Sequence, residues 1–403
     1  MKEAVIVGYL RTAWSRSRPG EPSKDWFGNL STSELFSRLL PEVLKRTDIS
    51  SEEIDDFIVG SALGVSENYT MGGRNPIFAA NLSEKVAAKF VDQQCGSSMA
   101  AIHIGAMEIQ TGNAETVLVG GMEHMTRVPM GMELVQRGAI VPNMSFFLEK
   151  KYRHWEMGTV TNMGLTAEKL TSQTDFTRKD LDEWGVRSHN LAQKAQEEGF
   201  FTDEILTVDS FQKGGSVLPV NRDQGVREDV KFEDIASLKP AYKPDGVITA
   251  GNASPLNAGA SSMILMSKDM AKKKGIRPLA TIRSIGFAGV DPTIMGIGPV
   301  PASRKALKIA GLDVKDIDFW EINEAFSIVV LYAMKELGID PEIINIMGGG
   351  LAIGHPLGAT GIRIVGTLAR ILQKKEGRYG VATACCGGGQ GVATVIERET
   401  YNW

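Results

Sequence analysis

The sequence predicts an α/β protein made of two similar units, with a segment of different character inserted between them. Three observations predict this fold. Buried-strand patterns alternate with helical patterns near both ends of the 403-residue chain. From about residue 125 to residue 250, charged and aromatic residues become more frequent and strand patterns thin out. Many of the 44 glycines follow apolar runs in pairs or triples, which is typical of sites lined by backbone.

The first unit begins with an apolar run at residues 4–7, which predicts a buried strand. Residues 33–44 have leucine and valine at helical spacing. Residues 56–60 and 116–121 predict two more strands. The helix expected between Cys95 and residue 116 is apolar on every face and rich in small residues. A helix with this composition is expected to be buried and closely packed.

The inserted segment has helical patterns over residues 166–195 and no regular pattern over residues 208–227. Strand and helix patterns alternate again from about residue 280. We expect strands at 318–321, 381–384 and 393–397, and a helix at 325–337. The two ends also resemble each other, because Cys95 and His355 each open a helix that leads to a strand ending in glycines. This correspondence suggests a duplicated α/β unit.

Composition excludes several classes of protein. The net charge of −4 leaves no general nucleic-acid footprint. Three cysteines do not make a disulfide framework, and their presence as thiols favours a reducing, cytoplasmic location. The first 20 residues lack the apolar core of a signal peptide, and no run reaches transmembrane length. No cluster has metal-ligand spacing, so we expect no metal, and no dinucleotide fingerprint follows the first strand.

Cys95 is the first candidate for chemistry. It is followed by Gly-Ser-Ser and then by a helical pattern, which places its sulfur at a helix N-terminus. Unpaired N–H groups and the helix dipole would lower the pKa of a thiol there. The alternative is a buried structural cysteine, but the small residues that follow favour a reactive one.

Three further residues complete the candidate set. Cys385 ends a strand and is followed by Cys386 and three glycines, and Cys386 is the better candidate for an inert core residue. His355 stands between Gly354 and Pro356 at a helix start, where a catalytic role is favoured over a structural one. Asn323 follows a strand and could cap a helix or hold a water. Cysteine, histidine and glycine-lined amides are the groups that acyl transfer through a thioester requires.

These motifs carry a resemblance to the thiolase family over essentially the whole chain. The matching blocks have the same order and spacing, and they lie at residues 94–98, 119–123, 163–168, 249–254, 299–304, 321–326, 354–361 and 385–389. The resemblance implies a thiolase-like fold, with two similar five-layered α/β core halves and a loop domain inserted in the first. It implies a first core half at residues 1–125 plus 257–277, a loop domain that binds CoA at 126–256, and a second core half at 278–403.

The resemblance also implies a role for each candidate residue. Cys95 is the nucleophile that takes the acyl group, and His355 activates it and helps to bind the thioester oxygen. Asn323 holds a water in this first oxyanion hole. Cys385 handles the proton on the acetyl carbon. The backbone N–H groups of Cys95 and Gly387 form a second oxyanion hole.

The contacts to CoA and to the acyl chain are also implied by the resemblance. Arg227 matches a family arginine and is a candidate for a phosphate or adenine contact, although it could equally be a solvated arginine in a loop. Asn162 replaces a histidine that biosynthetic acetoacetyl-CoA thiolases usually have, and Pro255 and Ala258 also depart from their pattern. The remaining candidates for this part of the site are Met163, Ser254 and Phe326.

The resulting prediction is a 3-ketoacyl-CoA thiolase of the degradative, β-oxidation kind, with CoA as a substrate and without a permanently bound cofactor. The nearest alternative is an acetoacetyl-CoA thiolase, which shares every catalytic residue. A decarboxylating ketoacyl synthase and a carrier of acyl-CoA or sterol without catalysis are weaker alternatives, because Cys95, His355 and Cys385 are all present. The resemblance further implies a homodimer or homotetramer, with a possible β-oxidation partner subunit and no bound nucleic acid.

Overall fold

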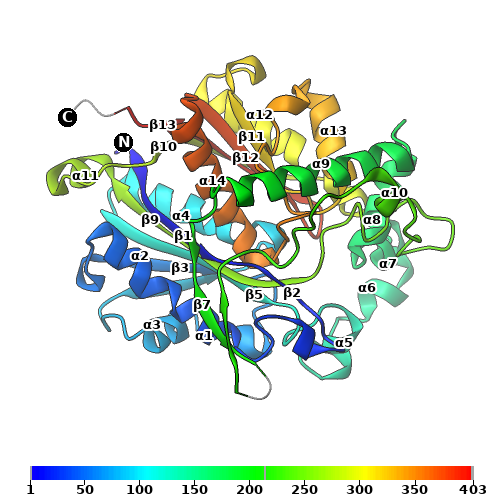
Figure 1. Ribbon diagram of the computed structural model, residues 1–403, viewed down its shortest axis with the longest axis horizontal. Helices are drawn as coiled ribbons and strands as arrows, with labels where there is room; N and C mark the ends of the chain where they lie inside the picture. Colours follow the sequence, from blue (N-terminus) through cyan, green and yellow to red (C-terminus); the bar gives the residue numbers. More distant parts are fainter. Residues whose placement is uncertain (1, 213–214, 401–403) are drawn as a thin grey trace.

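A computed structural model of the chain describes residues 2–212 and 215–400 and shows an α/β protein with a large central sheet (Figure 1). Its strands are β1 (Ala4–Thr12), β2 (Ser15–Arg16), β3 (Asp56–Gly60), β4 (Ala87–Val91), β5 (Thr116–His124), β6 (Ile205–Leu206), β7 (Val208–Phe211), β8 (Val217–Val220), β9 (Asn257–Ser267), β10 (Ala280–Gly289), β11 (Phe319–Ile322), β12 (Tyr379–Cys386) and β13 (Gln390–Arg398). Its helices are α1 (Thr32–Ser37), α2 (Leu39–Thr47), α3 (Arg74–Ala79), α4 (Ser97–Thr111), α5 (Met132–Gln136), α6 (Ser145–Leu148), α7 (Met157–Val160), α8 (Met163–Ser172), α9 (Arg178–Glu197), α10 (Phe232–Ala236), α11 (Lys268–Lys274), α12 (Pro299–Ala310), α13 (Ser327–Leu337) and α14 (Thr360–Lys375).

The main path of the sheet runs β11-β12-β13-β10-β1-β9-β5-β3-β4. In the first half, β1 pairs antiparallel with β9, β9 antiparallel with β5, and β5 parallel with β3. In the second half, β10 pairs antiparallel with β13, β13 antiparallel with β12, and β12 parallel with β11. Strands β1 and β10 pair with each other and join the halves. The same pairing pattern therefore occurs twice, which confirms the duplicated unit.

Helices α4 and α14 contact each other and form an inner layer between the two halves of the sheet. Residues of β1 alternate between two cores: Ala4 and Ile6 pack toward this inner layer, whereas Val5 and Val7 pack toward α2. On the far side of the second half, α12 packs on β10 and β13. The prediction of a buried helix after Cys95 is confirmed, because five of its apolar side chains are fully buried: Met99, Ala101, Ile102, Ala106 and Ile109.

The structure differs from the sequence-based expectations at residues 208–227 and in the segment that follows His355. Residues 208–227 were expected to be irregular, but β7 and β8 pair there as an antiparallel hairpin; residues 213–214 lie outside the described part. His355 was expected to open a helix directly. Instead, residues 356–359 form an extended residue and a 3₁₀ turn, and α14 begins only at Thr360. Pro356 is extended, with ψ of 104°, so the first helical position lies further along the chain.

None of the helices in the described part of the chain combines the length and the apolar character that crossing a bilayer requires.

Candidate active site

Cys95 lies in a 3₁₀ turn, Gln94–Gly96, which leads directly into α4. The preceding residue, Gln94, has a φ of 50°, in the left-handed region that non-glycine residues seldom adopt. This turn places the sulfur beside the start of the buried helix, with only 5% of Cys95 exposed. The predicted position of Cys95 at a helix N-terminus is therefore confirmed.

The expectation that this position lowers the pKa of Cys95 is wrong for the free protein. Burial raises the pKa of the thiol to about 11, although hydrogen bonds from the backbone N–H groups of Gly387 and of Cys95 itself act in the opposite direction. The sulfur is enclosed on all sides, and the loss of hydration outweighs the two donors. The resting thiol is therefore protonated, and a nearby base must take its proton before it can attack. The same contacts place the N–H of Gly387 at the Cys95 sulfur.

His355 is held by hydrogen bonds at its backbone and at both ring nitrogens. Its backbone N–H donates to Oδ1 of Asn257 at 2.8 Å. Nδ1 lies 2.6 Å from Oγ1 of Thr360, and that hydroxyl donates to the carbonyl of Pro356 at 3.0 Å. Because the Thr360 proton is already used, Oγ1 accepts the proton of Nδ1, which leaves a lone pair on Nε2. Burial, with a smaller effect from Arg363, lowers the pKa of His355 to about 3, so the resting ring is neutral.

Asn323 follows β11 and lies beside the imidazole. Its Nδ2 is 3.2 Å from Nε2 of His355, and its backbone N–H donates to the carbonyl of Thr383 in the strand that carries Cys385. Its Oδ1 is buried and has no hydrogen-bond partner among the described residues. A buried acceptor without a partner is costly unless a water or a ligand satisfies it. The position of this atom fits the predicted role of Asn323 as a holder of water.

Cys385 and Cys386 face opposite sides of β12, as expected for neighbours in a strand. Cys386 belongs to the core around α4 and α14, and Cys385 to the core of the second half. Burial raises the pKa of the Cys385 thiol, and the charge of the nearby Cys95 sulfur raises it further. Cys385 is therefore a protonated thiol close to the candidate nucleophile.

The fold thus brings together all five predicted catalytic residues. A thiol, a neutral imidazole, a second thiol, an amide and two backbone donors converge from four segments that are distant in the sequence. Such a set can form and break a thioester, and it can move one proton to or from a carbon atom.

Comparison with known proteins agrees with this chemistry. Residues 4–269 match the family model of the thiolase N-terminal domain, and residues 276–398 match that of the thiolase C-terminal domain. The chain belongs to the thiolase family. It is 41% identical over 402 residues to the 3-ketoacyl-CoA thiolase of Marinobacter nauticus, covering 98% of each chain.

Solved structures of thiolases have the same fold. An acetyl-CoA acetyltransferase of Bacillus anthracis superposes with a TM-score of 0.87 at 37% identity, covering 99% of each chain. Human mitochondrial 3-ketoacyl-CoA thiolase in complex with CoA superposes with a TM-score of 0.84 at 32% identity, covering 99% of this chain and 98% of that one. These similarities confirm the expected thiolase fold.

The residues predicted for substrate binding occupy different surroundings in this thiolase. Ser254 lines a cavity of about 410 Å³, and Phe326 packs nearby with its ring 6.2 Å from that of Tyr242. Arg227 lines a separate cavity of about 260 Å³, and its backbone N–H donates to Nδ1 of His189. Asn162 caps α8, where its Oδ1 accepts from the N–H of Leu165 at 3.2 Å, and Met163 is the first residue of that helix. The structure therefore gives Asn162 a capping contact.

Sequence analysis missed Glu123 as a residue that organises the thiolase site. Its carboxylate is fully buried at the end of β5 and accepts from the N–H groups of Ala62 at 2.8 Å and Gly358 at 3.0 Å. It also accepts from Ser61 and Asn68. Glu123 thus joins the loop beside Cys95 to the segment that carries His355. The only local signal was an acidic residue at the end of an apolar strand.

Two glycines allow the segments of the site to approach one another. A Cβ on Gly361 would lie 2.3 Å from the backbone nitrogen of Met99, so any side chain there would separate α14 from α4. Gly354 has a φ of 116°, and a Cβ there would collide with the side chain of Asn257, which anchors His355.

In residues 2–212 and 215–400, no group of three or more His, Cys, Asp or Glu side chains is arranged to hold a metal ion.

Proposed function

We propose that this chain is a 3-ketoacyl-CoA thiolase, which uses CoA to cleave a 3-ketoacyl-CoA into acetyl-CoA and a shortened acyl-CoA. The observation that carries this proposal is the proximity of Cys95, Cys385 and the Asn323–His355 pair. Cys95 packs with Leu357, two residues after His355, and the N–H of Asn323 donates to the carbonyl of Thr383, two residues before Cys385. The names of its relatives support it, since the 3-ketoacyl-CoA thiolase of Hahella chejuensis is also 38% identical over 98% of each chain.

In the first step, the Cys95 sulfur attacks the keto carbon of the substrate. The thiol proton passes to Nε2 of His355, which has a lone pair because Nδ1 carries the other proton, and the resting contact from Nδ2 of Asn323 is released as this proton arrives. The new carbon–sulfur bond places negative charge on the keto oxygen. Hydrogen-bond donors of the site that are already aimed at the keto oxygen stabilise this charge, because they do not have to reorganise.

In the second step, the bond between the keto carbon and the α carbon breaks. Its electron pair moves onto the departing acetyl-CoA as an enolate, and Cys385 supplies the proton that converts this enolate to acetyl-CoA. A thiol whose pKa is raised by burial is present as the acid, which is the form that this step requires. The acyl group remains on Cys95 as a thioester.

In the third step, the thiol of CoA gives its proton to the Cys385 thiolate left by the second step and attacks the acyl–Cys95 thioester. The shortened acyl-CoA is released, and the Cys95 sulfur takes back the proton held by His355, so that all three residues return to their resting state. We assign one oxyanion hole to Nε2–H of protonated His355 and a water held by Oδ1 of Asn323. We assign the other to the backbone N–H groups of Cys95 and Gly387, which already point at the sulfur. Cleavage and thioester exchange thus use the same residues.

An acetoacetyl-CoA thiolase is the second candidate, favoured by the high TM-score with the Bacillus anthracis acetyl-CoA acetyltransferase. Thiolysis assays with acetoacetyl-CoA, 3-ketohexanoyl-CoA, 3-ketodecanoyl-CoA and 3-ketohexadecanoyl-CoA distinguish the two. We expect the longer substrates to be cleaved at least as well as acetoacetyl-CoA. A kcat/KM for acetoacetyl-CoA more than about tenfold above the others, about 1.4 kcal/mol, would favour the second candidate.

Three further proposals rest on the family resemblance. The domain boundaries are proposed at residues 1–125 plus 257–277, 126–256 and 278–403. The protein is proposed to form a homodimer or homotetramer, and its cysteine usage supports the further proposal of a cytoplasmic location. A partner subunit of β-oxidation is proposed as a possible binding partner.

A further inference from the structure

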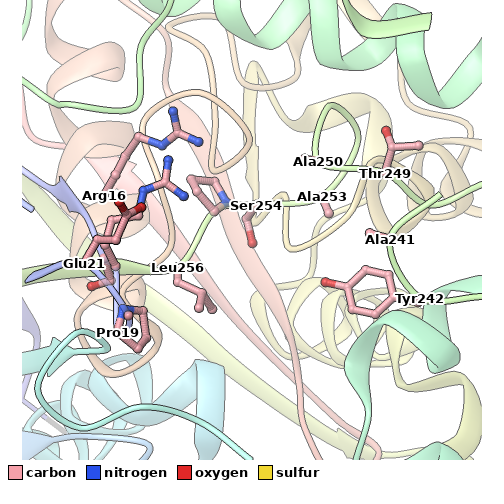
Figure 2. A pocket seen from close by; sticks show the side chains of 14 residues that line it. Arg16, Pro19, Glu21, Ala241, Tyr242, Thr249, Ala250, Ala253, Ser254 and Leu256 are labelled. Carbon is pink, nitrogen blue, oxygen red and sulfur yellow. The ribbon is translucent and has the colours of Figure 1, made fainter. Parts of the chain in front are cut away.

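Two arginines near the N-terminus line one wall of the cavity that contains Ser254. Residues 16–21 form this wall, and residues 241–242, 249–250 and 253–256 form the opposite one. Figure 2 shows Arg16 and Glu21 on one side of the cavity and Tyr242 and Thr249 on the other. Arg16 and Arg18 therefore face the segment in which substrate contacts were predicted.

The backbone holds these two arginines in fixed positions. Arg16 pairs with Asn257 in the short ladder between β2 and β9, and its N–H donates to the side chain of Gln224 at 2.8 Å. The N–H of Arg18 donates to Oγ1 of Thr126 at 2.7 Å. These contacts use main-chain groups only, and they leave both guanidinium groups available.

The guanidinium groups have no ion-pair or hydrogen-bond partner within residues 2–212 and 215–400. Burial lowers the pKa of Arg16, and the nearby positive charges of Arg18 and Arg227 lower it further. Glu21 is the one carboxylate among the residues that line the cavity; it pairs with Lys24 at 2.7 Å, and the charge of Arg18 also acts on it. One carboxylate that is shared with Lys24 does not balance the charges of both arginines, and an anionic ligand would balance the remaining positive charge.

The opposite wall of the cavity is connected directly to the catalytic segment. The N–H of Ser254 donates to the carbonyl of Ala325 at 3.0 Å, and Ala253 forms a β-bridge with Phe326, so this wall is attached just after Asn323. Asn257, opposite Arg16 in the ladder, accepts from the N–H of His355. A ligand in the cavity is thus in contact with elements that position the acyl-transfer residues.

We propose that Arg16 and Arg18 bind the diphosphate group of CoA and of acyl-CoA substrates, as residues that determine substrate affinity. This inference rests on the proposed function. A diphosphate carries at least two negative charges and offers oxygens on both phosphorus atoms, which two guanidinium groups can bind with paired N–H donors. The thiol end of the same ligand extends past Ser254 toward Cys95.

Arg227 serves a different part of the ligand. It lines the neighbouring cavity with His189, Gly251 and the two acidic residues Glu228 and Asp234, and the two cavities share Ala250. We assign this second cavity to the 3′-phosphate end of the nucleotide. Arg16 and Arg18 on one side of Ala250, and Arg227 on the other, would then bind chemically distinct phosphates. Ligands that lack one of these phosphates distinguish the two sites.

Calorimetric titration of the full-length protein with CoA and with 3′-dephospho-CoA tests the assignment. We expect Arg16→Gln and Arg18→Gln each to raise the Kd of both ligands about tenfold, the size of one charge-assisted hydrogen bond near a surface. Arg227→Gln should raise the Kd of CoA but leave the Kd of 3′-dephospho-CoA nearly unchanged.

Arg222→Gln is the matched control, because it removes the same charge from an arginine that lies over the Trp26 ring and lines neither cavity. An unchanged Kd in both Arg16→Gln and Arg18→Gln would overturn the assignment. A loss of affinity that is seen with CoA but not with 3′-dephospho-CoA would also overturn it. Thermal denaturation checks that each variant is folded, and exposed Arg18 provides the safer substitution. Binding is measured without turnover. A protein that binds CoA through these arginines but cleaves no 3-ketoacyl-CoA would therefore contradict the proposed function alone.

Discussion

The side-chain Nδ2 of Asn323 lies 3.2 Å from Nε2 of His355, and this contact joins two loops of the second half of the fold. The ring is fixed from the other side by Thr360, whose hydroxyl is already committed to the carbonyl of Pro356. Together these contacts select the tautomer with a proton on Nδ1 and a lone pair on Nε2.

Thr360→Val should remove the acceptor of the Nδ1 proton while keeping the volume of the side chain. We expect kcat to fall about tenfold or more, with little change in KM, because the ring loses its preferred tautomer and orientation. Thr360→Ser retains the hydroxyl and should recover most of the rate. Equal loss in the valine and serine variants would point to packing instead of proton placement.

Cys385→Ala should separate the two half-reactions. Exchange of the acyl group between acetyl-CoA and labelled CoA needs no proton on carbon, so it should partly survive. Cleavage of the carbon–carbon bond should fall by about 100-fold or more, the scale on which a general acid contributes. Cys386→Ala, which alters a core thiol on the opposite face of β12, is the control. If Cys385→Ala lowers the rates of exchange and of cleavage by the same factor, Cys385 is not the acid that protonates the carbon atom.

The alkylation of Cys95 by iodoacetamide should depend steeply on pH. Burial raises the pKa of this thiol to about 11, and the pKa of His355 is lowered to about 3, so neither residue is charged at neutral pH. The thiolate fraction, and with it the rate, should rise about tenfold for each pH unit between pH 7 and pH 9. Peptide mapping assigns the label. A rate that levels off below pH 7 would instead reveal a thiolate–imidazolium pair in the free enzyme.

Glu123→Gln should destabilise the protein, because Gln offers an NH₂ group where the carboxylate accepts from backbone N–H groups of Ala62 and Gly358. The free energy of unfolding, measured in urea, should fall by about 1–3 kcal/mol, the cost of buried donors left unsatisfied. Glu67→Gln, which breaks a partly exposed pair with Arg127, is the matched control and should cost at most about 1 kcal/mol. Similar losses in both variants would mean that Glu123 does not join the two loops.

Local patterns predicted most of the sheet. The apolar runs at residues 56–60 and 116–121 became β3 and β5, and the second starts at the expected residue but continues to His124. The helix expected at residues 33–44 is broken at Arg38 into α1 and α2. The β7–β8 hairpin was missed because its strands are four residues each and their partly exposed positions carry no continuous apolar run.

The residues of the site also fall into two groups, those that local patterns predicted and those that only the fold brings together. Cys95, His355, Asn323 and Cys385 were predicted because each lies in a motif whose neighbours signal a strand end or a helix start. Glu123 was not, because its partner Gly358 is 235 positions away in the chain and only the fold brings them together. The pKa of Cys95 was predicted in the wrong direction, since a local pattern shows the donors at a helix start but not how completely the sulfur is enclosed.

The central claim is that acyl transfer passes through a thioester on Cys95. Its most direct test is to mix the protein with 3-ketodecanoyl-CoA in the absence of free CoA, quench it in acid, and map the acylated peptide by mass spectrometry. We predict one shortened acyl group on the peptide that contains Cys95, its removal when CoA is added before the quench, and its absence from Cys95→Ser. An acyl group on Cys385 or Cys386, or cleavage of the substrate without any acylated peptide, would contradict this mechanism.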